Sequence, residues 1–199
     1  MNIKDLKFSL TFGKIFNGAV IAALAILFFV PAAKGKLIEG LMKAGLFQPH
    51  IPAVRSTVVK IEVPDITFER SNGQLVHLAA LKGKVVFINF WATWCPPCIA
   101  ELPSINALYL KSQADSNLVF LTVDADNDFS KSVRFMQRHH LSVPLVKANT
   151  AVPENMLGGS IPTTVIIDKS GAMVFSHEGA ADYSNPQVVA FLKKLSRDN

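Results

Sequence analysis

Two cysteines separated by two residues, Cys95 and Cys98, constrain this chain most, because they are its only cysteines. They follow a run of strand-forming residues, 85–90, and precede a helical pattern of apolar residues at Ile99, Leu102, Ile105 and Leu108. The pair is therefore expected where a buried strand ends and a helix begins. Backbone N–H groups and the helix dipole at such a junction favour a thiolate on the first sulfur. The arrangement suits thiol–disulfide exchange.

The composition limits the other functions open to the chain. Its 199 residues allow one ordinary domain plus appendages, and two cysteines are too few for a disulfide-stapled fold or a four-cysteine zinc site. The net charge is +5, but the lysines and arginines are scattered, so we expect no nucleic-acid partner. We also expect no metal, and no cofactor other than a redox-active Cys95–Cys98 disulfide.

An apolar segment near the N-terminus covers residues 15–33 and is interrupted only by Asn17. Its length of about nineteen residues is close to what a helix needs to cross a bilayer, so we predict a transmembrane anchor with residues 1–14 in the cytoplasm. A cleaved signal peptide remains an alternative, because Val30-Pro31-Ala32 offers a small-residue cleavage site, and so does a buried core helix. Lysines flank the segment almost equally, and the positive-inside rule leaves its orientation nearly balanced.

Residues 34–60 are irregular, and we interpret them as a linker with a short amphipathic helix over residues 37–46 on the membrane surface. Two short apolar runs follow, 65–68 and 75–78, on either side of Asn72-Gly73. Both residues of this dipeptide tolerate positive φ, so the pattern predicts a β-hairpin at the start of the globular domain.

The globular domain is predicted over residues 61–199, and strands alternate with helices in it. After the first core strand and the cysteine helix, a second buried strand is expected over 118–123 and a helix over 130–140. This order predicts a parallel βαβ unit. The later elements that we expect are a short helix near 153–157, strands over 165–168 and 172–176 joined by a turn, and a last helix with Asn185 as its cap and Pro186 as its first residue.

This pattern resembles the thioredoxin fold, an α/β fold with a central mixed sheet flanked by helices. The matching residues are Trp91 and Trp94 before the first cysteine, Pro103 at the kink of the active-site helix, and Ile161-Pro162-Thr163 at the cis-proline loop. The run from Phe90 to Cys98, the N-terminal β-hairpin and the N-terminal transmembrane helix are more similar to the TlpA/ResA/CcmG group. Those proteins are anchored, extracytoplasmic thiol–disulfide oxidoreductases that mostly act as reductants. The resemblance covers residues 61–195.

The position of the cysteines predicts their roles in catalysis. Cys95, at the helix end, is expected to be the exposed nucleophile, and Cys98, one turn further in, the shielded resolving thiol. The resemblance implies that the cis-proline loop packs beside the disulfide and offers backbone groups to a bound peptide. Pro162 is expected to be cis because this loop turns tightly. The substrate-binding residues that we predict are Trp94, Pro96, Pro97, Ile161 and Pro162.

One residue departs from the thioredoxin pattern. Thioredoxins carry a buried aspartate on the central strand that assists proton transfer, and this chain has Asn89 there. Glu101, one turn past Cys98, matches an acid of the ResA-like branch and is predicted to replace that aspartate as a catalytic residue. The alternative is that Glu101 only stabilises the first turns of the helix through its charge.

The two prolines between the cysteines suggest the direction of the reaction. Neither Pro96 nor Pro97 has an N–H, so the loop around Cys95 lacks donors that would stabilise its thiolate. A less stabilised thiolate has a higher pKa and belongs to a more stable disulfide. We therefore expect a reductant with a potential closer to that of thioredoxin than to that of DsbA.

The resemblance also implies partners and a location. We expect a protein disulfide substrate, apocytochrome c or a copper-site assembly protein, and a membrane thiol-reducing electron donor. A disulfide substrate implies an oxidising compartment, so the domain is expected on the periplasmic side of the cytoplasmic membrane. We also expect the protein to be a monomer. A copper-binding module of the same fold remains an alternative, because thiolates suit Cu(I) and His177 is a candidate third ligand. The paired prolines argue against a third possibility, an isomerase or oxidant.

Overall fold

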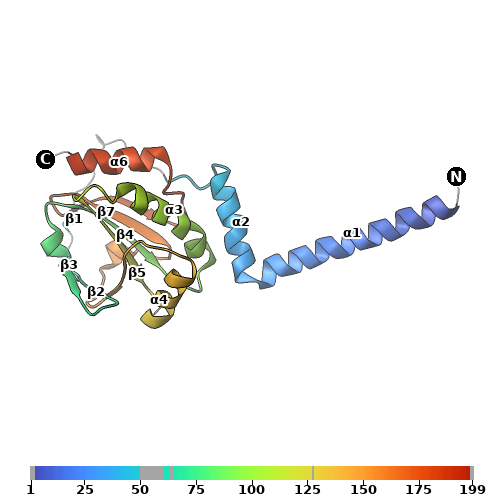
Figure 1. Cartoon of the computed structure of the whole chain (residues 1–199), viewed down its shortest axis with the longest axis horizontal. Coiled ribbons are helices and arrows are strands. Elements are labelled where there is room, and N and C mark those ends of the chain that lie inside the picture. Colours follow the sequence, from blue (N-terminus) through green and yellow to red (C-terminus); the bar gives the residue numbers. More distant parts are fainter. Residues whose placement is uncertain (1–2, 50–60, 63–64, 127, 198–199) are drawn as a thin grey trace.

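The computed structural model describes residues 3–49, 61–62, 65–126 and 128–197, and only the backbone of residues 3–15, 31–32, 43 and 61–62. Figure 1 shows a globular part at one end and a long helix that projects away from it. The elements are α1 (Ile3–Phe29), α2 (Pro31–Lys43), β1 (Ile61–Glu62), β2 (Thr67–Arg70), β3 (Leu75–His77), the 3-10 helix η1 (Leu78–Leu81), β4 (Val85–Trp91), α3 (Pro96–Ser112), β5 (Leu118–Asp124), α4 (Phe129–Arg138), β6 (Leu145–Ala148), α5 (Glu154–Leu157), β7 (Thr163–Ile167), β8 (Ala172–Glu178) and α6 (Pro186–Arg197).

The strands of the described residues form one mixed sheet in the order β1-β8-β7-β4-β5-β6-β2-β3. Strands β4, β5 and β6 are parallel, and β7 runs antiparallel to β4. The predicted parallel βαβ unit is therefore confirmed as β4–α3–β5. The strand β6, which we did not predict, continues it. Every residue of β4 is buried, as expected for a central strand that is covered on both faces.

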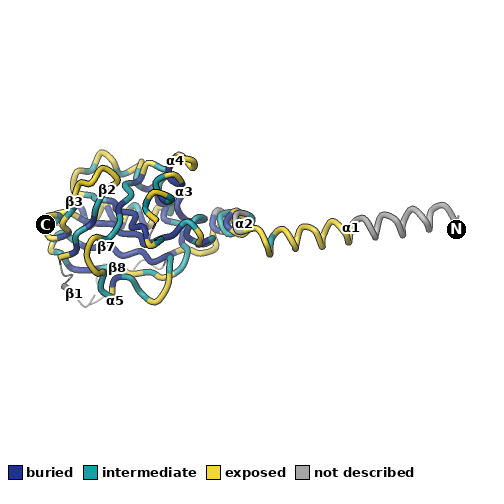
Figure 2. Tube along the Cα trace, turned by 90° about the horizontal axis from the view of Figure 1, so that it is seen from below, coloured by how far each residue is buried: buried dark blue, intermediate teal, exposed yellow. Residues whose placement is uncertain are grey.

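The two faces of the sheet are covered by different elements. Alternate residues of a strand point to opposite faces, and on β4 Phe87 and Trp91 join an apolar cluster with residues of α3, α4 and α6. Ile88 and Phe90 join a second cluster with residues from β2, η1 and α5. Figure 2 shows the resulting buried centre of the domain. The cysteine loop therefore follows directly on a strand that is packed on both faces.

Two local predictions are confirmed, one of them with a different mechanism. The β2–β3 hairpin forms, but of its two turn residues only Gly73 has a positive φ, at 81°, and Asn72 does not. The amide of Gly73 donates to the carbonyl of Arg70, so the turn is longer than the predicted two-residue turn. At the start of α6, Asn185 Oδ1 accepts from the amide of Gln187 at 2.8 Å, which is the predicted cap.

The N-terminal helix differs from the predicted single span over residues 15–33. Helix α1 ends at Phe29 and α2 begins at Pro31, with Val30 extended between them. The ring of a proline disfavours helical geometry in the preceding residue, which accounts for the break. Within the part of the chain that the structure describes, no helix alone is long and apolar enough to cross a membrane, whereas Phe16–Phe29 and Ala33–Met42 together meet that measure as a pair bent by 93°.

The segment predicted as a linker is largely ordered. In place of a short helix over residues 37–46, α2 begins at Pro31 and ends at Lys43. It lies beside α3, and Gly35 and Met42, two turns apart on one side of α2, are buried (Figure 1). The rest of the predicted linker, residues 50–60, lies outside the described residues.

Candidate active site

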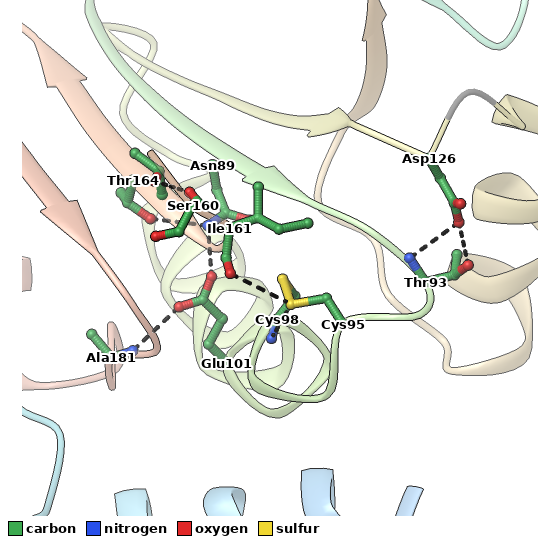
Figure 3. Close-up of a disulfide and its surroundings, with 11 residues drawn as sticks. Asn89, Thr93, Cys95, Cys98, Glu101, Asp126, Ser160, Ile161, Thr164 and Ala181 are labelled. Carbon is green, nitrogen blue, oxygen red and sulfur yellow. Dashed lines mark hydrogen bonds between the residues drawn. A yellow bond between two sulfur atoms is a disulfide. The ribbon is translucent and has the colours of Figure 1, made fainter. Parts of the chain in front are cut away.

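The cysteine loop lies at the carboxyl end of β4, beside the predicted cis-proline loop. Strand β7 runs antiparallel to β4 with Thr163 opposite Phe90, so the residues just before β7 lie next to the residues just after β4. The peptide bond Ile161-Pro162 is cis, as predicted. Figure 3 shows Ile161 above the two cysteines. The register of the sheet therefore brings together residues that are far apart in the sequence.

Cys95 and Cys98 form a disulfide, with their Cα atoms 5.3 Å apart. Cys95 caps α3, and its Sγ accepts a hydrogen bond from the amide of Cys98 at 3.3 Å. Pro96 and Pro97 occupy the first helical positions and offer no donor. The expectation that the loop gives Cys95 no donor is therefore wrong in one respect, because the cap geometry aims the amide of Cys98 at the sulfur.

A carbonyl oxygen faces the same sulfur. The oxygen of Ile161 lies 3.8 Å from Cys95 Sγ. Lone pairs directed at a sulfur disfavour its negative charge and favour the protonated thiol. One N–H donor and one carbonyl oxygen thus act on Cys95 in opposite directions, and the site is less favourable to a thiolate than a helix N-terminus with free amides.

The exposure of the site residues corrects one prediction and confirms another. Cys95, expected to be exposed, is only 3% exposed in the disulfide form, because its sulfur lies under the cis-proline loop, and Cys98 is 0% exposed. Trp94 is 60% exposed and lies on the surface, as expected, whereas Trp91 is fully buried against Phe135. Of the other predicted substrate-binding residues, Pro96, Pro97 and Ile161 are half-buried and Pro162 is buried.

Glu101 lies one helical turn past Cys98 and is completely buried (Figure 3). Its Oε1 accepts from Nδ2 of Asn89 at 2.7 Å, and its Oε2 accepts from the amide of Ala181 at 3.2 Å. Nδ2 of Asn89 also donates to Oγ1 of Thr164 at 2.9 Å. The asparagine that replaces the thioredoxin aspartate therefore holds the glutamate in place.

Burial controls the ionisation of Glu101. It raises the pKa of Glu101 from 4.5 to about 8, although the hydrogen bonds from Asn89 and Ala181 oppose this shift. Burial, together with the charge of Glu101, also raises the pKa of Tyr183 well above its usual value. The carboxyl group is thus protonated at neutral pH, and it can release its proton when the pH rises slightly above neutral. This differs from the alternative in which Glu101 acts as a helix-stabilising charge.

A second carboxylate, which the sequence did not reveal, holds the cysteine loop from the other side. Asp126 follows β5 and accepts from the amide and the hydroxyl of Thr93, while Nζ of Lys131 lies 3.5 Å away. Although burial opposes ionisation, these hydrogen bonds and the Lys131 charge lower the pKa of Asp126. The parallel pairing of β4 and β5 could have pointed to Asp126. Trp91 pairs with Asp124, so the residues that follow the two strands, Thr93 and Asp126, meet at one edge of the sheet.

The structure does not bring His177 and the cysteines together as a metal centre. Among the described residues no three His, Cys, Asp or Glu side chains form a group that could hold an ion. His177 lies on β8, where its ring stacks on that of Phe175, and burial lowers its pKa. No observation here favours the copper-binding alternative.

Comparisons with known proteins agree with this geometry. The family model described as Redoxin matches residues 59–192. Thiol-disulfide oxidoreductase ResA of Bacillus cereus is 32% identical over 136 residues, which are 68% of this chain and 77% of that protein. A solved structure from Bacteroides vulgatus has a TM-score of 0.57 at 30% identity and covers 67% of this chain and 93% of its own. A thiol:disulfide interchange protein of Chlorobium tepidum TLS, at 24% identity, shares the fold with a TM-score of 0.55 over 71% of this chain and 99% of its own.

Proposed function

This chain belongs to the Redoxin family and is a thiol–disulfide oxidoreductase, and we propose that it is a membrane-anchored reductase of protein disulfides outside the cytoplasm. The proposed substrate is apocytochrome c, whose haem-attachment cysteines must be reduced, and the proposed electron donor is a thiol-reducing membrane protein. The observation that carries the direction is the environment of Cys95 Sγ, where the Ile161 carbonyl opposes the single amide donor.

The reaction uses the two thiols in sequence. The Cys95 thiolate attacks one sulfur of the substrate disulfide, that S–S bond breaks, and the released substrate thiolate takes up a proton. Cys98 then loses its proton and attacks Cys95 Sγ in the mixed disulfide. The second substrate thiolate leaves and is protonated. The substrate gains two electrons and two protons, and the enzyme is left with the Cys95–Cys98 disulfide.

Glu101 is proposed to accept the proton that Cys98 must lose. It lies one turn from Cys98 on α3, and a pKa of about 8 allows a carboxyl group both to take up and to release a proton near neutral pH. Asn89 has no proton to exchange in this range, and its role is to orient the carboxyl group through Nδ2. Trp94, with its exposed ring, and the Ile161-Pro162 backbone are proposed to contact the substrate.

The reduction potential tests the proposed direction. The full-length protein in detergent would be equilibrated with mixtures of reduced and oxidised dithiothreitol, and the fraction of disulfide measured by thiol labelling. A reductant should lie near thioredoxin, at about −270 mV, whereas an oxidant lies near DsbA, at about −120 mV. A value near the second would overturn the reductase and leave the oxidoreductase assignment intact.

The proposed anchor has support in the length and surface of α1. The 27 residues of Ile3–Phe29 extend about 40 Å at the rise of an α-helix, which matches the length of a membrane span, and α1 meets the apolarity of a span together with α2. Apolar side chains along its second half, among them Ile21, Leu24 and Phe28, are more than half exposed. Extraction of membranes at alkaline pH checks this: the protein should stay in the membrane pellet, and its release would contradict an anchor.

A further inference from the structure

Helix α2 presents one face to the active-site helix. Gly35 and Met42, two turns apart, are buried on this face. A Cβ atom added at Gly35 would lie 3.5 Å from the carbonyl oxygen of Pro96 and 3.8 Å from Cγ2 of Ile99. These are ordinary van der Waals distances, so Gly35 lies against the first turn of α3, next to the disulfide.

The chain that follows α2 is attached to the domain as well. The amide of Asp182 donates to the carbonyl of Phe47 at 3.1 Å, and the side-chain amides of Asn185 and Gln48 are hydrogen-bonded. The loop that carries Asp182 also supplies the Ala181 amide to Glu101. Helix α2 is thus held against the domain at both ends and does not act as a free tether.

The opposite face of α2 is apolar and exposed. It carries Leu37 and Leu41, which are 47% and 36% exposed and point away from Gly35, given the 100° turn per residue. Lys34 and Lys36 flank these leucines and are exposed. The elbow between α1 and α2 borders an open hollow of about 700 Å³, which is lined almost entirely by apolar side chains of both helices. Nζ of Lys34 lies 5.3 Å from the Phe28 ring.

We propose that this outer face rests on the surface of the bilayer, so that α2 lies between the lipid and α3 and holds the dithiol near the headgroups. The inference rests on the proposed anchor, because the 93° bend places α2 in the membrane plane when α1 crosses the bilayer. Figure 2 shows α2 between the exposed second half of α1 and the globular domain. Lysines beside an apolar stripe are what an interfacial helix presents to anionic lipids.

The position of α2 determines which partners can reach the dithiol. Packed helices lie about 8–10 Å apart, and an interfacial helix sinks roughly 5–10 Å into the headgroup region. Since Gly35 of α2 lies against the first turn of α3, the Cys95–Cys98 loop lies about one helix diameter from the lipid. The partners that this geometry favours are disulfides and dithiols presented at the membrane surface, by membrane-embedded or membrane-tethered proteins.

Spin labels test the contact with lipid directly. The full-length protein, with both cysteines replaced by serine, would carry a nitroxide at Leu41→Cys and be placed in vesicles of phosphatidylcholine and phosphatidylglycerol. We expect this label to collide more with oxygen, which concentrates in lipid, than with a water-soluble nickel chelate. The control is Leu75→Cys on β3, where a leucine that is 48% exposed, against 36% for Leu41, lies on the hairpin and the label should favour nickel.

Two results of this experiment would overturn the proposal. One is equal access of nickel to the labels at Leu41 and Leu75. The other is spin–spin broadening at Leu41, which would mean that a second copy of the chain covers this face. Flotation of the same vesicles separates the causes, since protein that does not float has lost the anchor itself, whereas floating protein with a nickel-accessible label disproves only the role of α2.

A functional test uses a disulfide peptide attached to the vesicle lipid by a short or a long flexible tether. The native protein should reduce both. In a Leu37→Glu/Leu41→Glu variant, α2 should leave the lipid surface and move the dithiol away from it. The variant should reduce the short-tethered peptide about tenfold more slowly, because the short tether no longer brings the peptide to the dithiol, and the long-tethered peptide at the native rate. Equal rates on both peptides in the variant would overturn the proposal. Failure of the native protein to reduce either peptide would instead contradict the proposed reductase.

Discussion

Two carboxylates lie on either side of the cysteine loop, and they are in opposite states of ionisation. Glu101 lies on the inner side, fully buried, and neutral amides donate to it, so its pKa rises to about 8. Asp126 lies on the outer side, where Thr93 donates to it twice and Lys131 is 3.5 Å away, so its pKa falls. At neutral pH the first carries a proton and the second a charge.

The difference separates a chemical role from a structural one. A carboxyl group that titrates near the working pH can transfer a proton during catalysis, whereas one that stays ionised cannot. A permanent charge is instead a strong hydrogen-bond acceptor, which suits an anchor for a loop. We therefore expect that replacement of Glu101 alters the pH dependence of the reaction, and that replacement of Asp126 alters only the stability of the loop.

The largest expected effect is that of Glu101→Gln on turnover. Loss of a positioned proton acceptor should slow disulfide reduction about 10²-fold, the lower end of the range for general acid–base catalysis. The native rate should also rise with pH through about 8 as the carboxyl group ionises, and the variant should keep only the rise that the ionisation of Cys95 contributes. Insulin reduction between pH 6 and 9 measures both. A variant with a native pH profile would contradict the proposed role.

The second effect concerns stability. The folded protein holds the Glu101 proton up to about pH 8, while the unfolded chain releases it near 4.5. The folded state therefore binds more protons in this window, and the free energy of unfolding should fall by about 1.4 kcal/mol for each pH unit. Urea unfolding of the oxidised protein at several pH values tests this. The slope should be absent in Glu101→Gln, and a persistent slope would assign it to another group.

A rescue is expected from the double variant Asn89→Asp/Glu101→Gln, which exchanges the acid and the amide across a 2.7 Å hydrogen bond. The acid then lies on the central strand, as in thioredoxins. We expect it to recover about tenfold of the activity lost in Glu101→Gln, because a proton acceptor returns to the same pocket. Asn89→Asp alone is the control, since two facing carboxyls share one proton and raise the upper pKa. No recovery would mean that the position of the acid, rather than its presence, is decisive.

The smallest effect is that of Asp126→Asn. It weakens the bonds to Thr93 and removes the charge that faces Lys131, which should lower stability by about 1 kcal/mol and leave the pH profile of turnover unchanged. Thr93→Val is the matched variant, because it removes the hydroxyl and keeps the amide donor. Thermal unfolding and insulin reduction of both variants measure the effect. A shifted pH profile in Asp126→Asn would contradict the assignment of a structural role to Asp126 and of proton transfer to Glu101 alone.

The sequence by itself determined the features that depend on near neighbours. Cys95 and Cys98 can close one small ring, and the strand-to-helix junction around them follows from the change in apolar spacing. The cap at Asn185 and the hairpin at Gly73 follow from what those residues do to the adjacent backbone. The cis bond at Pro162 is expected because the loop turns tightly there, and the loop itself is identified by its resemblance to the cis-proline loop of thioredoxins. Each of these signals lies within a few residues of the structure that it predicts.

Only the tertiary structure decided the environment of the dithiol. The amide of Ala181 reaches Glu101 across 80 residues of sequence, and Asp126 reaches Thr93 across 33. Helix α2 lies largely within the segment that the sequence predicts as a linker, and it packs on α3 with Gly35 and Met42 buried. A pKa depends on how much water remains around a group and which dipoles face it, and both are set by everything that packs there. The same glutamate on an open helix would be an ordinary surface charge, and here burial makes it a proton acceptor.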